Sequence, residues 1–220
     1  MLKIVALEEI PDDKKRRRVV FADESTVELS LEATLAAGFL PGRTVSAAEV
    51  SRAVREDRLK EAEHDALRLL RTKDRSEAEL RKELGRRGYD GQTIAAIIRK
   101  CRGWGYLDDK RLAERIVSEG IEHKHLGPAR VRQTLRRRGI DDETADEVRG
   151  KIEAGQPDLV EQAFQALRPK MRSYARLEPE VARRRMIGFL GRRGYTYETI
   201  RQVLERAGRS AGDEGELPEE

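Results

Sequence analysis

Few side chains in this sequence have the type and spacing that chemistry requires. His123 and His125 are the only closely spaced histidines, and their i, i+2 spacing places the two rings on different faces of a helix. No further His or Cys follows them at the spacing of a zinc site. The lone cysteine, Cys101, lies in an apolar-periodic helical stretch, so we expect it to pack in the core rather than to act as a nucleophile.

Two shorter patterns also have structural explanations. Asp108 and Asp109 carry the ligand type that magnesium prefers, but they precede a predicted helix and suit an N-cap followed by a favourable acidic first turn. Gly103 and Gly105 lack the remainder of any phosphate-binding loop. The sequence therefore predicts a non-enzyme with no cofactor and no metal site.

Arginine is the unusual component of the composition. The chain has 34 Arg and 11 Lys against 41 acidic residues, and 39% of its residues are charged, where about a quarter is usual. The planar arginine fork suits two-point contacts with phosphates and carboxylates. Residues 208–220 hold one Arg and five acids, which leaves a net charge of +8 on the preceding 207 residues. This excess favours an anionic partner, although solvated helix faces also account for arginine-rich composition.

Strand-like patterns are confined to the N-terminal segment. Residues 4–7 are apolar, and residues 18–21 and 26–29 flank a polar turn at 22–25, which predicts a hairpin. A short helix over 31–37, closed by Gly38, follows. From Ser46 onward the pattern is helical, and capping-box spacings occur at 46–49 and 76–79.

An internal repeat organises the helical part of the chain. Three segments align without gaps on the anchors Leu84, Leu135 and Leu190, which lie 51 and 55 residues apart. An apolar residue lies four positions before each anchor, a glycine suited to ending the helix lies four positions after it, and a Schellman-type apolar residue and a capping residue then follow. The residues in these positions are Leu80, Val131 and Met186; Gly88, Gly139 and Gly194; Tyr89, Ile140 and Tyr195; and Asp90, Asp141 and Thr196. Three units of three helices follow from this pattern.

These patterns predict a mainly α fold with a small N-terminal β-containing segment. The predicted parts are a strand-bearing segment (1–45), three helical repeats (46–108, 109–155 and 156–207) and a disordered acidic tail (208–220). No apolar run approaches the roughly 20 residues needed to span a bilayer, and a single cysteine excludes an intramolecular disulfide framework. We therefore expect a soluble, cytoplasmic protein that makes no membrane contact.

The repeat segments resemble the regulatory protein RecX family over roughly residues 55–207. The matching residues are Leu69-Leu70 with 76–80 (SEAEL) and Leu84-x-x-x-Gly88-Tyr89, then 104–113 (WGYLDDKRLA), then 127–140 (GPARVRQTLRRRGI). The resemblance implies an elongated, curved body of three tandem three-helix repeats. It also implies binding to the RecA recombinase, chiefly as a filament on DNA, and modulation, mainly inhibition, of its activity. Such a regulator of DNA repair, homologous recombination and the SOS response is expected to act as a monomer, with direct DNA contact as an additional expectation.

The arginines of the repeats are the candidate contacts with this partner. The candidates are Arg81, Arg86, Arg87, Arg132, Arg136, Arg137, Arg183, Arg184, Arg192 and Arg193. Two alternatives stay open: a direct DNA- or RNA-binding protein built from helical repeats, and a purely structural helical scaffold. Aromatic side chains for stacking on bases are sparse, because Trp104, Tyr106, Tyr89 and Tyr195 are all predicted to be core or Schellman residues.

Overall fold

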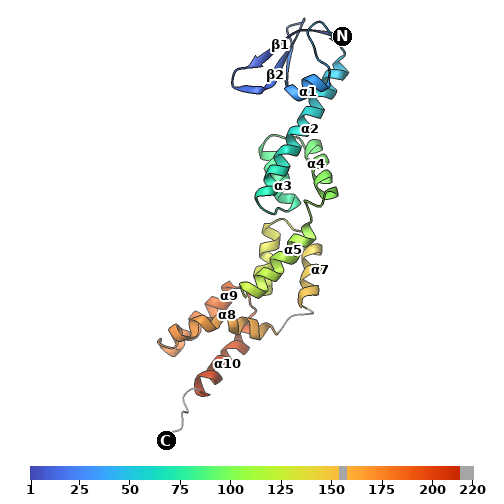
Figure 1. Cartoon of the computed structure of the whole chain (residues 1–220). Helices are drawn as coiled ribbons and strands as arrows, with labels where there is room; N and C mark the ends of the chain where they lie inside the picture. Colours follow the sequence, from blue (N-terminus) through green and yellow to red (C-terminus); the bar gives the residue numbers. More distant parts are fainter. Residues whose placement is uncertain (154–157, 214–220) are drawn as a thin grey trace. The chain divides into compact units, whose positions relative to one another are not determined.

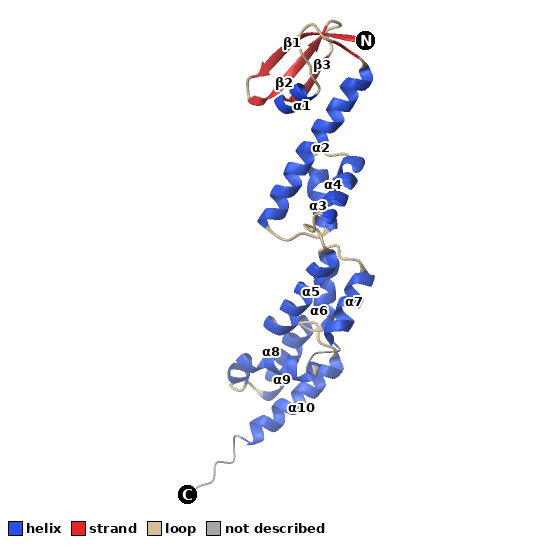
Figure 2. Cartoon of the chain, turned by 45° about the vertical axis from the view of Figure 1, so that its right-hand side comes forward, coloured by secondary structure: helices blue, strands red, loops and turns tan. Residues whose placement is uncertain are grey.

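The computed structural model describes residues 1–153 and 158–213, and within these ranges the chain is mostly helical (Figures 1 and 2). The chain divides into two compact units. The first comprises Met1–Asp74 and Leu80–Tyr106, and the second comprises Arg75–Glu79 and the described residues from Leu107 onward.

An antiparallel sheet opens the first unit. Its strands are β1 (Leu2–Ile10), β2 (Asp13–Phe21), β3 (Thr26–Ser30) and β4 (Thr44–Val45), in the order β3-β2-β1-β4, and helix α1 (Leu31–Ala36) follows β3 (Figure 2). The predicted strands, hairpin turn and short helix are confirmed. Strands β1 and β2 are longer than predicted because Glu8 and Glu9 lie opposite Arg18 and Arg17, so opposite charges support pairing where no apolar pattern exists.

Helix α2 (Ala47–Thr72) begins at the predicted capping box. The Ser46 hydroxyl accepts from the Glu49 amide at 3.1 Å, and the Glu49 carboxylate accepts from the Ser46 amide at 2.7 Å. Further along the helix, the carboxylate of Asp57 is buried and accepts hydrogen bonds from both the amide and the hydroxyl of Ser30, at 3.0 and 2.5 Å. This buried carboxylate is satisfied by two donors and fixes the end of β3 against α2.

Three three-helix domains account for the rest of the described chain. The first consists of the C-terminal half of α2 with α3 (Glu77–Arg86) and α4 (Gly91–Gly103). The second consists of α5 (Asp109–Ser118), its continuation as a π-helical turn η1 (Glu119–His123), α6 (Pro128–Arg137) and α7 (Asp142–Glu153). The third consists of α8 (Leu159–Tyr174), α9 (Pro179–Arg192) and α10 (Tyr197–Asp213).

The repeated pattern has the predicted physical basis in all three domains. The anchors Leu84, Leu135 and Leu190 are at most 1% exposed. The glycine after each anchor is left-handed, and the next amide bonds back to the anchor carbonyl as in a Schellman motif. The φ angles are +80° at Gly88, +73° at Gly139 and +89° at Gly194, and the amide donors are Tyr89, Ile140 and Tyr195. Asp90, Asp141 and Thr196 cap the third helices as predicted.

Two details differ from the predictions. Met186 is only partly buried, unlike its counterparts Leu80 and Val131. Helix α10 runs to Asp213, so residues 208–213 are helical instead of belonging to a disordered tail. Once a helix is nucleated, each added residue gains a backbone hydrogen bond, and the sequence has no proline before Pro218 to stop α10 earlier. The remainder of the predicted tail, 214–220, lies outside the described residues.

Candidate partner-facing surface

The candidate arginines of the first domain differ in their contacts. Arg81 is exposed on α3 and forms no ion pair or hydrogen bond with any residue that the structure describes. Arg86 pairs with a glutamate one turn before it. Arg87 pairs with Asp65 of α2 at 2.8 Å, and the Tyr89 hydroxyl donates to the same carboxylate at 3.1 Å. Burial raises the pKa of Asp65, but these hydrogen bonds outweigh it and hold the pKa below its ordinary value. Arg87 therefore contributes to packing within its own domain.

Two of the three candidates in the second domain are also paired. Arg132 contacts Asp146 at 2.9 Å, and Arg136 donates two hydrogen bonds to Asp142, at 2.7 and 3.0 Å. This two-point contact lowers the pKa of the Asp142 carboxyl. Arg137 is exposed and has no such partner among the residues described.

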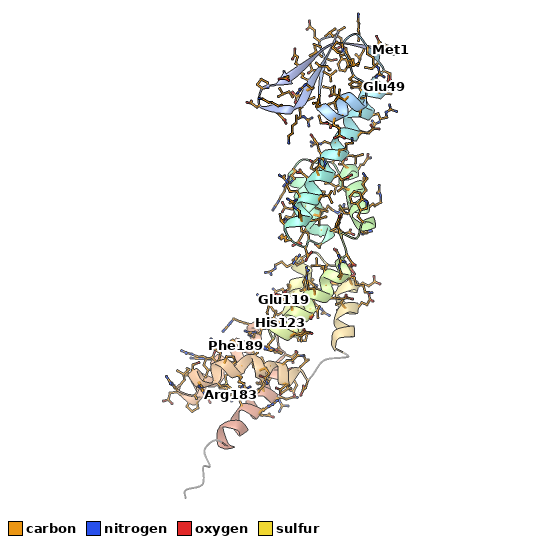
Figure 3. The ribbon with its side chains drawn as sticks, viewed as in Figure 1. Met1, Glu49, Glu119, His123, Arg183 and Phe189 are labelled. Carbon is orange, nitrogen blue, oxygen red and sulfur yellow. The ribbon has the colours of Figure 1, made fainter. Side chains whose placement is uncertain are left out.

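The third domain holds the candidates that are most available. Arg183, which is labelled in Figure 3, and its neighbour Arg184 are exposed on α9 beyond its first turn. Within the described chain neither forms an ion pair or a hydrogen bond. Arg192 is exposed near the end of α9 and is likewise unpaired there. These three guanidinium groups are free to meet an external anion.

Arg193 has a structural role instead. Its guanidinium donates to the backbone carbonyls of Lys124 and His125, and it lies 4.9 Å from the ring centre of Phe189. The Tyr195 hydroxyl donates to the same His125 carbonyl at 3.0 Å. Arg193 and Tyr195 thus connect the second and third domains within one compact unit.

Sequence reasoning missed several cations that belong with the available arginines. The missed cations are Arg168, Lys170, Arg172 and Arg176; they and Arg185, which completes the arginine run 183–185 noted in the sequence, are exposed and form no ion pair with described residues. Together with Arg183 and Arg184 they give residues 168–185 seven cations against two acids. We call 168–185 the basic segment. Its charge density is visible in the sequence, but the search for aligned repeats overlooks it because the other domains have no equivalent run.

The prediction that Trp104 and Tyr106 are core or Schellman residues is wrong for Trp104 and confirmed for Tyr106. Tyr106 does occupy a Schellman position, because its amide bonds to the Cys101 carbonyl at 2.9 Å and Gly105 is left-handed. However, Trp104 is 47% exposed and Tyr106 57% exposed, with their rings 6.3 Å apart in an edge-to-face arrangement. Leu107, only 3% exposed, takes the core position that follows this turn.

The histidines, the cysteine and the aspartate considered in the sequence as chemical candidates occupy positions with a structural explanation. His123 lies in η1, whereas His125 lies beyond it with φ +45°. The prediction that both lie on one helix is therefore wrong. Cys101 is fully buried in α4, and this burial raises the pKa of its thiol. Asp108 caps α5 as predicted, accepting from the Arg111 amide at 2.9 Å. Among residues 1–153 and 158–213, no cluster of three metal-ligating side chains is present, and no helix is both long and apolar enough to cross a membrane.

Comparison with known proteins gives these three domains a family. Models of the first, second and third three-helix domains of RecX match residues 62–101, 108–148 and 157–204. The chain belongs to the RecX family. The first and third matched intervals fall inside the corresponding predicted repeats, and the second begins one residue before its predicted repeat, at 108 instead of 109. The repeat boundaries stay predictions.

Individual RecX proteins agree with this assignment. A regulatory protein RecX from Amycolatopsis mediterranei is 30% identical over 162 residues, which cover 74% of this chain and 91% of that protein. One from Trichlorobacter lovleyi is 35% identical over 145 residues, covering 64% and 92%. A crystal structure of a regulatory protein RecX aligns with a TM-score of 0.65 at 19% identity, over 93% of this chain and all of that one. RecX from Lactobacillus salivarius gives 0.61 at 20% identity, over 70% and 98%. The chain therefore has a RecX fold and is related to regulatory proteins.

Proposed function

We propose that this RecX-family chain is a non-enzymatic, cytoplasmic monomer that binds a RecA-type recombinase and its nucleoprotein filament. Binding mainly inhibits the recombinase, and the chain thereby regulates DNA repair, homologous recombination and the SOS response. The contacts are made by the unpaired arginines of the three domains, foremost Arg183 and Arg184, with Arg81, Arg137 and Arg192.

The availability of the third-domain arginines carries this proposal. Exposed guanidinium groups without internal partners lose no ion pair when they bind an anion, and they release counterions from a polyanionic filament. Paired arginines such as Arg136 must first give up a two-point contact with a carboxylate. Several modest contacts from successive domains add together because the first contact raises the effective concentration of the next.

A matched pair of double variants tests the assignment. R183A/R184A removes two unpaired cations, and R132A/R136A removes two paired ones, so both change the net charge equally. Binding to labelled recombinase–DNA filaments is measured by anisotropy over a salt series, with DNA alone and recombinase alone as further ligands. We expect R183A/R184A to weaken filament binding more than R132A/R136A. If its arginines contact phosphates, the salt slope falls by about 1.4–1.8.

The salt series separates the possible targets. A loss of affinity with an unchanged slope would assign the contacts to acidic side chains of the recombinase. Equal affinity for the filament and for bare DNA would contradict recombinase binding as the main role. Unchanged binding of R183A/R184A would show that these arginines are merely solvated.

Direct contact with single-stranded DNA is a second candidate, favoured by the exposed Trp104 and Tyr106. Exposed aromatic rings beside cations provide stacking surfaces for bases, and the Lys100 ammonium lies 5.9 Å from the centre of the Trp104 ring. Trp104 is the only tryptophan of the chain, so its fluorescence reports on this position alone. Quenching by oligo-dT that disappears in Y106A but persists in Y197A, a control at another exposed tyrosine, would support stacking. An emission spectrum indifferent to oligo-dT would contradict it.

A further inference from the structure

An apolar groove opens on the third domain beside the basic segment. It has a volume of about 730 Å³ and lies between the C-terminal half of α8, the first half of α9 and helix α10. Its apolar lining includes Met171, Leu177, Met186, Ile187, Ile200 and Leu204. A volume of this size is typical of a ligand site, where a pocket of roughly 300–1,000 Å³ is usual.

The side chains of the groove suit an aliphatic ligand of adaptable shape. Met171 and Met186 are two of the three methionines in the chain, and both are only partly buried. Flexible thioether side chains recur on surfaces that accommodate apolar side chains of different shapes. Met186 is only partly buried, unlike the residues at the same position of the other repeats, and its exposed part lines this groove.

The rim of the groove is positively charged. Arg172 and Arg183 line it, both are exposed, and neither forms an ion pair or hydrogen bond with the described part of the chain. Both belong to the basic segment, with its seven cations and two acids. Arg201, a third lining residue, is already paired with Glu198 and Glu205 at 2.7 and 2.9 Å. The free charge on the rim is therefore cationic.

We propose that this groove binds an acidic amphipathic α-helix of a partner protein. The apolar face of the helix packs on the methionines and aliphatic side chains of the floor, and its carboxylates meet Arg172 and Arg183. The inference does not depend on recombinase binding, because it assigns a helix of this chemistry to the groove whichever protein supplies it.

The dimensions of the groove favour a helix over other occupants. Along α10 it extends from Tyr197 to Gly208, a distance of about 16 Å at 1.5 Å per residue, which matches about three turns of a ligand helix. Three turns present anchors at i, i+3 or i+4, and i+7, the spacing of helix-in-groove recognition. The walls are helices and offer an extended peptide no strand edge. The aliphatic floor favours leucine-like side chains over nucleic-acid bases, which need aromatic faces or polar partners.

A designed peptide tests the proposal on the full chain. The probe is a fluorescein-labelled helix of about 14 residues with leucines at i, i+3, i+4 and i+7 and glutamates elsewhere on its surface. Anisotropy should show saturable binding. Replacing the leucines by serine, or the glutamates by lysine, should weaken binding about tenfold or more, because both the apolar face and the charge are needed.

Protein variants and methionine NMR locate the site. R172E/R183E should weaken peptide binding by about tenfold, whereas R184E/R192E, with the same charge change on α9 outside the groove, should weaken it less than about threefold. All four arginines are exposed, so thermal melts should stay unchanged. In a chain labelled with ¹³C-methyl methionine, the peptide should shift the Met171 and Met186 signals and leave Met1 in place.

Several results would overturn the proposal. Absence of saturable binding, equal sensitivity to the two double variants, or equal binding of the serine peptide would each exclude a specific helix groove. If a single-stranded oligonucleotide shifts the NMR signals of the same two methionines, and its binding is weakened by R172E/R183E but not by R184E/R192E, the groove is a nucleic-acid site instead.

Discussion

The second and third domains share one architecture but use their arginines differently. In the second domain the acidic start of α7 supplies Asp142 and Asp146, which pair with Arg136 and Arg132 of α6. In the third domain α10 begins with Tyr197 and Glu198, and Glu198 pairs with Arg201 of the same helix. The arginines of α9 are left without partners in the described chain. Arg132 and Arg136 therefore form ion pairs inside the second domain, whereas the arginines of α9 leave an open cationic surface on the third.

The largest expected effect concerns what the two domains have in common. Leu135 is 1% exposed and Leu190 is 0% exposed, and each anchors the core of its domain. Replacing either with alanine should lower the free energy of unfolding by about 2–5 kcal/mol, measured by urea denaturation. An unchanged midpoint for L135A or L190A would show that the alignment of the two repeats is wrong.

A smaller effect should separate neighbouring arginines of the third domain. Arg193 donates to two backbone carbonyls of the second domain, whereas the exposed Arg192 makes no such contact with the described residues. R193A should lower the unfolding free energy by about 1 kcal/mol, because it removes charge-assisted hydrogen bonds at a half-buried site. R192A should change it by less than about 0.5 kcal/mol. Equal effects in thermal melts would contradict the structural role of Arg193.

The paired state in the second domain predicts a shift in titration. The hydrogen bond from Arg136 lowers the pKa of Asp142, so the pair stabilises the fold above the carboxyl's unfolded pKa and loses this contribution as pH falls through the folded pKa. In R136A, NMR titration should find the pKa of Asp142 raised toward its ordinary value. R183A/R184A should leave the Asp142 titration where it is in the unmodified chain.

The smallest expected effect concerns the acidic residues at the end of the chain. Residues 214–220 contain four glutamates and no cation. Deleting them should leave the melting temperature unchanged and slightly strengthen binding to a polyanionic filament, because repulsion is removed. Weaker filament binding by the truncated chain, measured by anisotropy, would show that these residues contribute to the interaction.

The repeat could be predicted from sequence because its signals are local. An anchor leucine, a left-handed glycine and a capping residue lie within a few positions of one another, and each has one physical role. The state of the arginines could not be predicted in this way. Arg136 and Arg183 both belong to runs of three arginines, and the runs alone do not show that Arg136 pairs with Asp142 on the next helix while Arg183 has no partner among the described residues.

The exposure of the Trp104 and Tyr106 side chains could likewise not be predicted from the local sequence pattern. Trp104, Tyr106 and Leu107 flank the turn at Gly105 and are all apolar enough to enter the core, and the smallest of the three is the one buried. The groove on the third domain could not be predicted from local sequence either, because it is formed by three helices that meet only in the folded chain.

Helix α2 gives the first unit mechanical continuity. One helix of 26 residues holds the sheet through Asp57 and then packs into the first three-helix domain, so the predicted boundary at residue 46 separates two kinds of structure without placing a hinge between them. A force applied to the N-terminal strands would be transmitted through the continuous helix α2 to α4. We therefore expect the sheet and the first domain to resist force together and to yield in a single event.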